Sequence, residues 1–194
     1  LACAIEAATQ PKPKLYRSEV AVNGTIPALN DREDLERVVN SFPGVSTFKV
    51  KVGENLSEDI ARINTIRSLR PSSTIRIDAN GLWSVDQAVS FLQSVGNIEY
   101  IEQPCATIEE LRELKQQINV KIVGDEVLRK AKDPFAIDLV GAVDYLMLKV
   151  QPLGGIKRAH QIAEHHKLPV VVSSALESAV GINYGLTLAA SFEE

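Results

Sequence analysis

The chain has 194 residues, a formal net charge of -4, 45% hydrophobic residues and 24% charged residues, values typical of a folded globular domain. Its lysines and arginines are scattered, which argues against nucleic acid or an anionic membrane as a partner. No apolar run approaches the roughly 20 residues that cross a bilayer. The two cysteines form neither a CxxC pair nor a disulfide pattern, so we expect a cytoplasmic protein. Because nucleic acid and membrane partners are disfavoured, we expect it to act on a small molecule.

The first ten residues, LACAIEAATQ, are typical of the end of a helix and not of a signal peptide. We therefore expect the chain to begin inside a larger protein. Short β-rich runs then alternate with longer helical patterns, the order typical of repeated βα units and a parallel sheet. The seven predicted strands are Tyr16–Val22, Thr47–Val52, Thr74–Asp78, Ile98–Glu102, Lys121–Asp125, Tyr145–Val150 and Pro169–Ser173.

Helix-start signals occupy the intervals between these strands. They include capping boxes, an N-cap followed by proline, and apolar residues at helical spacing. The predicted helices follow Ser57, Ser84, Thr107 and Asp133, and a further one starts near Ala179. The pattern predicts one α/β domain over residues 1–194, a parallel (β/α) barrel of the TIM type. The barrel is expected to be incomplete, because about seven strands are visible and a full barrel needs roughly 250 residues.

A polar or charged residue stands at the end of six successive predicted strands, and intervals of 27, 24, 23, 24 and 24 residues separate them. One βα repeat returns the chain to the same end of the next strand, and active sites of such barrels lie at that C-terminal end. We therefore expect all six side chains at one mouth. They are Lys51, Asp78, Glu102, Asp125, Lys149 and Ser173.

Three of the six are acids: Asp78, Glu102 and Asp125. Three facing carboxylates repel one another unless they are neutralised, and hard oxygen ligands on rigid strands suit Mg²⁺. We predict that they converge within the span of one ion. Singly, each acid could instead cap a helix or pair with a surface lysine.

Lys51 and Lys149 come before and after the acids in barrel order. A partly desolvated lysine near a metal ion could supply a neutral amine as a base. Two such lysines could remove a proton α to a metal-bound carboxylate, so we predict a small carboxylate substrate.

The strand-end motifs K-V-K, D-A-N, E-Q-P, G-D-E and L-K-V-x-x-x-G-G together resemble the enolase superfamily, specifically its muconate-lactonising-enzyme-like subgroup. The resemblance implies that Asp78, Glu102 and Asp125 bind Mg²⁺ or Mn²⁺. It also implies that Lys51 and Lys149 lie on opposite faces of the substrate. The subgroup has an N-terminal capping domain and an eighth strand, which cannot be found here, so we expect a fragment of a longer enzyme.

Residues 173–181, SSALESAVG, resemble the seventh-strand segment of o-succinylbenzoate synthases, which are lyases of this subgroup. This resemblance implies dehydration of 2-succinyl-6-hydroxy-2,4-cyclohexadiene-1-carboxylate in menaquinone or phylloquinone synthesis. It would make Lys51 the base and then the acid of a syn elimination, with cationic Lys149 holding the enolate. Ser173 and Ser174 are candidate donors to a substrate carboxylate, with an ordinary turn and N-cap as the alternative.

Two further basic residues are candidate substrate contacts. Arg76 lies two residues before Asp78 in the same predicted strand, so its side chain should point to the same side as that of Asp78. Lys49 precedes Lys51 by two residues, and a solvated surface charge is its alternative.

Other functions remain open at this point. N-succinylamino acid racemases and dipeptide epimerases of the same superfamily share the two lysines and the three acids. A non-catalytic binding barrel would retain the motifs by descent only. An unrelated barrel, such as an aldolase with a Schiff base at Lys149, would leave the three in-phase acids without a role.

Overall fold

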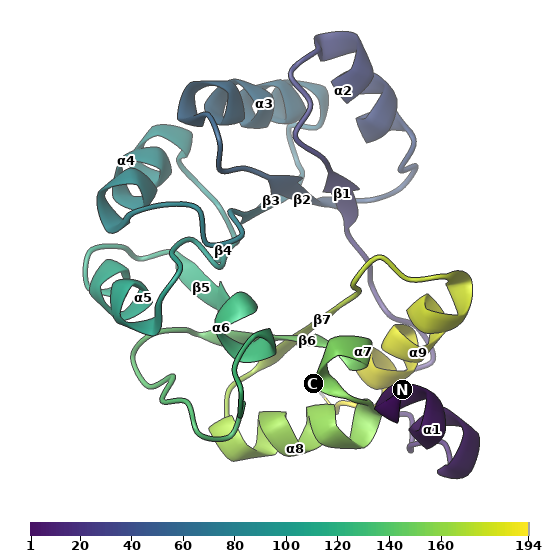
Figure 1. Cartoon of the computed structure of the whole chain (residues 1–194). Helices are drawn as coiled ribbons and strands as arrows, with labels where there is room; N and C mark the ends of the chain where they lie inside the picture. The colour runs from purple at the N-terminus through teal and green to yellow at the C-terminus, as the bar shows by residue number, and fades with distance from the viewer. Residues whose placement is uncertain (194) are drawn as a thin grey trace.

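A computed structural model describes residues 1–193. Seven strands form one sheet in chain order, and every neighbouring pair is parallel. Figure 1 shows the strands as the inner wall of an open ring whose helices lie outside. The strands are β1 (Gly24–Ile26), β2 (Thr47–Lys51), β3 (Thr74–Asp78), β4 (Tyr100–Glu102), β5 (Lys121–Gly124), β6 (Tyr145–Lys149) and β7 (Val170–Ser173).

Two helices begin at the capping boxes that the sequence predicts. Both capping boxes are present, with Ser84 before α4 and Thr107 before α5, and each satisfies backbone N–H groups that a helix start leaves free. The helices are α1 (Ala2–Thr9), α2 (Arg32–Asn40), α3 (Leu56–Leu69), α4 (Val85–Val95), α5 (Ile108–Lys115), α6 (Glu126–Arg129), α7 (Val150–Leu153), α8 (Ile156–His166) and α9 (Ala179–Ala190). Within residues 1–193, no helix combines the length and apolarity that crossing a bilayer requires.

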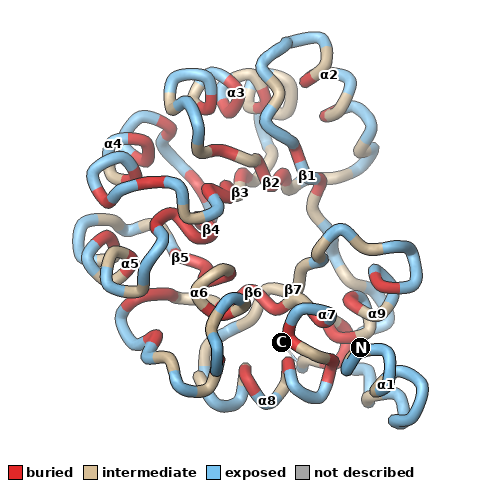
Figure 2. The backbone as a smooth tube through the Cα atoms, viewed as in Figure 1, coloured by how far each residue is buried: buried red, intermediate tan, exposed pale blue. Residues whose placement is uncertain are grey.

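The main hydrophobic core lies between the sheet and the outer helices. Alternate strand residues such as Phe48, Ile77 and Leu146 are fully buried there against helix residues such as Ile63. The burial colours of Figure 2 follow this layer around the ring. Because side chains alternate along a strand, the other set faces the ring interior, where the acids and lysines of the strand ends lie.

The first predicted strand is wrong. Tyr16–Val22 is not a strand, and most of its residues are exposed; the strand is the short Gly24–Ile26. A Cβ on Gly24 would lie 3.0 Å from the rings of Phe42 and Phe48. Glycine is a poor strand former, but a side chain at this position would crowd the two aromatic rings.

The helix predicted after Asp133 is also wrong. Asp133 Oδ1 accepts a hydrogen bond from Phe135 N at 3.0 Å, and Asp133 O accepts one from Ala136 N at 3.2 Å. The aspartate thus closes a turn, as Asx residues do outside helices. The connection from β5 to β6 carries the single-turn helix α6 instead.

β1 and β7 are the two edges of the sheet, and the described strands do not close the ring. A cavity of about 500 Å³ lies between them, lined by residues that include Thr25, Val171, Ser173 and Leu186. The sheet is therefore a curled, incomplete barrel, in agreement with the seven strands predicted.

Candidate active site

The six predicted strand-end side chains lie at the carboxyl ends of successive parallel strands. Asp125 directly follows β5, and the other five end β2, β3, β4, β6 and β7; they are Lys51, Asp78, Glu102, Lys149 and Ser173. Lys51 is in register with Asp78, and Asp78 with Glu102. The spacing-based prediction that these positions share one end of the sheet is confirmed.

The three acids are fully buried at these strand ends. Burial and the neighbouring charges of Asp78 and Asp125 raise the pKa of Glu102 to about 7, although Lys49 opposes the shift. Burial would also raise the pKa of Asp78, but the ammonium groups of Lys49 and Lys51 outweigh it and hold the pKa below its usual value. The pKa values of Glu102 and Asp78 are therefore shifted in opposite directions, and Asp78 has two ammonium partners where Glu102 has one.

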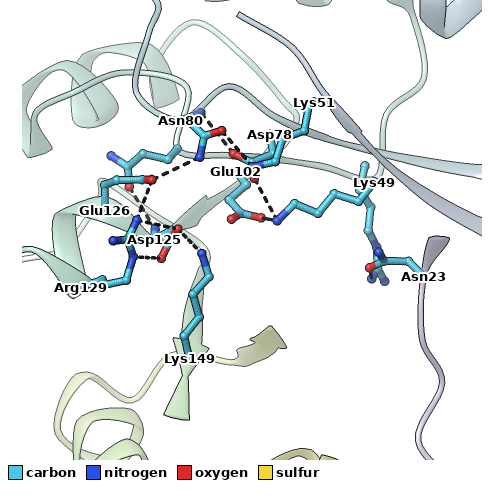
Figure 3. A network of polar contacts seen from close by, with 12 residues as sticks. Asn23, Lys49, Lys51, Asp78, Asn80, Glu102, Asp125, Glu126, Arg129 and Lys149 are labelled. Atoms are coloured by element: carbon cyan, nitrogen blue, oxygen red, sulfur yellow. Dashed lines mark hydrogen bonds and ion pairs between the residues drawn. The ribbon is translucent and has the colours of Figure 1, made fainter. Parts of the chain in front are cut away.

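The lysines reach the acids from two sides. Lys51, on β2, donates to Asp78 Oδ2 at 2.6 Å and to Asn80 Oδ1 at 2.9 Å. Lys149, on β6, donates to Asp125 Oδ2 at 2.5 Å. Because β2 and β6 flank the acid-bearing strands, the two ammonium groups approach the acids from different directions (Figure 3).

Lys49 is not the solvated charge that was its alternative interpretation, since it is only 7% exposed. Its ammonium lies 3.0 Å from Asp78 Oδ2 and forms a second ion pair with Glu102. Burial alone would lower the pKa of Lys49, but the two carboxylates raise it above its ordinary value. Lys49 thus neutralises part of the acidic group from inside the ring.

The predicted convergence of the three carboxylates on one ion is wrong for these side-chain positions. Across the described residues, no group of three or more His, Cys, Asp or Glu side chains is arranged to hold a metal ion. The physical reason is charge pairing, because each carboxylate is turned toward a basic side chain. Asp78 faces Lys51 and Lys49, Glu102 faces Lys49, and Asp125 faces Lys149.

The donor set nevertheless fits a hard divalent cation. Three carboxylates occupy three adjacent strand ends away from water, and carboxylate oxygens are the ligands that Mg²⁺ prefers. Glu102 Oε1 is buried without a hydrogen-bond partner, and its Oε2 has only the ion-pair contact with Lys49. A buried acceptor without a donor is costly, and a cation would relieve it after the other two carboxylates rotate toward it.

A second polar layer surrounds Asp125, and its members Arg129 and Glu126 were not singled out from the sequence. Arg129 Nε donates to Asp125 Oδ1 at 3.1 Å, and Arg129 Nη2 donates to Glu126 Oε1 at 2.9 Å. Asn80 Nδ2 donates to the same Glu126 oxygen at 3.2 Å, which connects this layer to Lys51 (Figure 3). The i, i+4 spacing of Asp125 and Arg129 was the only available signal, and it is common on exposed helices.

Gln103 was also missed. Its side chain is fully buried, and its Oε1 accepts from Asp125 N at 3.0 Å and from Val127 N at 3.2 Å. Its Nε2 donates to Cys105 O at 2.8 Å. The amide therefore joins the end of β4 to the start of α6 and fixes the backbone that carries Asp125.

The candidate substrate contacts lie in different places. Ser173 is in register with Lys149, so it stands beside one lysine at the mouth, and exposed Ser174 follows it. Arg76 lies on β3 two residues before the strand end at Asp78. There it pairs with Glu99 and donates to Asn23 Oδ1 at 3.2 Å. The structure brings the serines to the mouth and gives Arg76 protein partners.

A family model described as "Enolase C-terminal domain-like" matches residues 32–194. The chain is 46% identical over 200 residues to the o-succinylbenzoate synthase of Mycolicibacterium smegmatis and 48% identical to that of Mycobacterium tuberculosis. These alignments cover 100% of this chain but 61% and 60% of the two relatives. The chain thus spans about three fifths of the length of the curated relatives it matches.

Solved structures with the same fold include the L-Ala-D/L-Glu epimerase from Bacillus subtilis, with a TM-score of 0.81 and 28% identity. The N-succinyl Arg/Lys racemase from Bacillus cereus has a TM-score of 0.79 and 26% identity. The first match covers 91% of this chain and 53% of the epimerase, and the second covers 94% and 52%. The sequence relatives and the structural neighbours therefore carry different activities on a shared barrel.

Proposed function

Because the chain belongs to the enolase C-terminal domain-like family, we propose that its parent protein is an o-succinylbenzoate synthase acting in the cytoplasm on a small carboxylate. The observation that carries the proposal is the placement of Lys51 and Lys149 on two sides of three buried strand-end acids. Identities of 46% and 48% to synthases, against 28% and 26% to the epimerase and the racemase, support the synthase.

Asp78, Glu102 and Asp125 would hold a divalent cation, Mg²⁺ or Mn²⁺. When bound, the ion supplies positive charge beside the substrate carboxylate, which stabilises the negative charge that develops as the α-proton leaves. Rotation of Asp78 and Asp125 toward the ion would release the ammonium groups of Lys51 and Lys149. Both lysines would then be free to face the substrate.

Lys51, in its neutral form, would remove the proton on the carbon α to the substrate carboxylate. Lys51, now an ammonium group, would then give that proton to the hydroxyl group, which leaves as water while the ring becomes aromatic. One side chain can perform both transfers only if the proton and the hydroxyl group leave from the same face. Lys149 would stay cationic and stabilise the enolate, and Ser173 and Ser174 would donate hydrogen bonds to a substrate carboxylate.

The test is an assay of the full-length protein with the cyclohexadiene substrate and with N-succinylamino acids, each with Mg²⁺ and with a chelator. We expect a higher kcat/KM for dehydration than for racemisation, and loss of both activities with the chelator. Activity that persists in the chelator would contradict the metal site.

A second candidate is racemisation of N-succinylamino acids or epimerisation of dipeptides. TM-scores of 0.79 and 0.81 show that proteins with these names share the fold, and a pair of lysines on two sides of the acids suits their chemistry as well, although the sequence identities favour the synthase. A kcat/KM ratio in favour of racemisation would select this function. Absence of turnover with every substrate would indicate a binding barrel.

A further inference from the structure

A buried ion pair lies directly behind the proposed base. Asp59 and Arg62 stand one turn apart on α3 and are 3% and 4% exposed. Arg62 Nη1 donates to Asp59 Oδ1 at 2.5 Å. Taking two charges out of water costs several kcal/mol per ion unless further hydrogen bonds satisfy them, so the remaining partners of the pair show what it holds.

The ion pair forms hydrogen bonds to the backbone at the end of β2, on both sides of Val52. Arg62 Nη1 also donates to the main-chain carbonyl of Lys51 at 2.9 Å. Asp59 Oδ2 accepts from the main-chain N–H of Gly53 at 2.7 Å. Arg62 therefore donates to the last carbonyl of the strand, and Asp59 accepts from the N–H group two residues later.

Within residues 1–193, the carbonyl of Lys51 and the N–H group of Gly53 have no hydrogen-bond partner on a neighbouring strand. Val52 N donates to Asp78 O at 3.0 Å, so Val52 points its backbone toward β3. The backbone N–H and C=O groups of Lys51 and Gly53 point to the opposite side, toward β1. On that side the register ends at Ile26 paired with Val50, so α3 supplies the partners that β1 does not reach.

The same guanidinium also holds the loop after β1. Arg62 Nε donates to Leu29 O at 2.7 Å, and Nη2 donates to Asn30 Oδ1 at 2.7 Å. One planar fork thus joins α3, the end of β2 and the loop after β1. A lysine ammonium is a compact point charge and cannot reach acceptors on three segments at once.

We propose that Arg62, oriented by Asp59, is a positioning residue for Lys51. It fixes the main chain of Lys51 in place of a missing strand partner, so that the side chain leaves the strand toward Asp78 and Asn80. Displacement of a reacting group by about 1 Å can cost about a hundredfold in rate. The rate consequence rests on the proposed function, whereas the geometric consequence does not.

The experiment compares full-length wild type with Arg62→Lys, and uses Asp144→Asn as the matched control. Asp144 anchors another ion-pair cluster, with Lys115 and Lys121, away from Lys51. We expect Arg62→Lys to lower kcat at least about tenfold with KM nearly unchanged, because substrate binding is retained while the base is misplaced. The control should lose stability with kcat retained.

A second readout is independent of activity. Lys51 has a side chain that is 37% exposed, so an amine-acylating reagent can label it, and mass spectrometry can follow each lysine separately. We expect the ratio of Lys51 to Lys149 labelling rates to rise in Arg62→Lys and to stay at the wild-type value in the control. If Arg62→Lys does not fold, Asp59→Asn, which keeps the shape of the side chain, replaces it in both measurements.

The outcomes separate the two proposals. If wild type shows no lyase activity, the proposed function fails, and the labelling ratio alone decides the role of Arg62. A folded variant with an unchanged labelling ratio overturns the positioning role. So does a kcat loss no larger than that of the Asp144→Asn control.

Discussion

The two proposed catalytic lysines differ in their surroundings. The Lys51 side chain is 37% exposed and shares Asp78 with Lys49, whereas the Lys149 side chain is 11% exposed and shares Asp125 with Arg129. Proton transfer requires a group that can change its charge, and electrostatic stabilisation requires one that keeps it. This difference in surroundings fits the two different roles proposed for the lysines.

The first prediction concerns these roles. Lys51→Ala should abolish dehydration, whereas Lys149→Arg should leave measurable activity because it keeps a cation of altered shape. Solvent deuterium exchange at the substrate α-carbon should require Lys51 alone. If each single variant instead retains exchange with the opposite enantiomer of an N-succinylamino acid, the enzyme is a racemase. Exchange that is unaffected by loss of Lys51 would refute its role as the base in either enzyme.

The second prediction concerns Gln103. Gln103→Leu keeps a similar volume but leaves the N–H groups of Asp125 and Val127 without their acceptor. A buried donor without a partner costs about 1–3 kcal/mol, so the free energy of unfolding should fall by at least about that amount in urea titrations. The control is Gln117→Leu at an exposed position. Equal midpoints for the two variants would show that the Gln103 amide does not hold α6.

At the scale of elements, Asp144 ties the start of β6 to α5 and β5. Its carboxylate pairs with Lys115, lies 3.3 Å from Lys121 and accepts from Ile122 N at 2.9 Å. Burial would raise the pKa of Asp144, but these hydrogen bonds and the charge of Lys115 hold it below its usual value. The ionised carboxylate is therefore more favourable in the folded protein than in the unfolded chain.

The third prediction follows from this linkage. A carboxyl group with a lowered pKa in the folded state contributes stability above its unfolded pKa of about 3.9, and loses it as the pH falls through the folded value. Asp144→Asn should cost on the order of 1 kcal/mol at pH 7, and the difference from wild type should shrink below about pH 4. Denaturant titrations at several pH values measure it.

The control for this measurement is Asp138→Asn. Asp138 lies 3.5 Å from Arg112, and its side chain is 74% exposed, so the pair is screened by water. We expect little change at any pH. A pH-independent effect of Asp144→Asn would mean that its shape, and not its charge, supports the fold.

At the scale of the whole molecule, opposite charges are concentrated at the mouth of the barrel. Three buried acids are balanced by Lys49, Lys51, Lys149 and Arg129. A ligand that binds only the folded state stabilises it by mass action. Metal binding at this mouth should therefore be visible in global unfolding as well as in activity.

The fourth prediction uses that linkage. Mg²⁺ at a free concentration of 100 times its dissociation constant should stabilise full-length protein by about 2.7 kcal/mol, measured as a rise in the midpoint of thermal unfolding. Asp125→Asn, which removes one anionic ligand, should reduce the rise at the same concentration. Magnesium-free buffer with NaCl at matched ionic strength is the control for screening. An equal rise in wild type and Asp125→Asn would exclude Asp125 as a ligand.

The sequence by itself determined the order of strands β2 to β7 and the order of the site residues at their ends. Six strand-end residues recur at intervals of 23 to 27 residues, and each βα repeat returns the chain to the same end of the sheet. Ser84 and Thr107 also predicted their helices correctly, because a capping box is satisfied within four residues. Local periodicity and local hydrogen bonds are sufficient for these features.

The tertiary structure decided which groups meet across the sequence. Asp133 closes a turn and β1 begins at Gly24, because distant packing overrides weak local preferences. The acids pair with lysines and not with one another, and Arg62 holds the carbonyl of Lys51 from α3. Such contacts depend on burial and on strand lengths on both sides of a residue, and no spacing pattern along one chain contains that information.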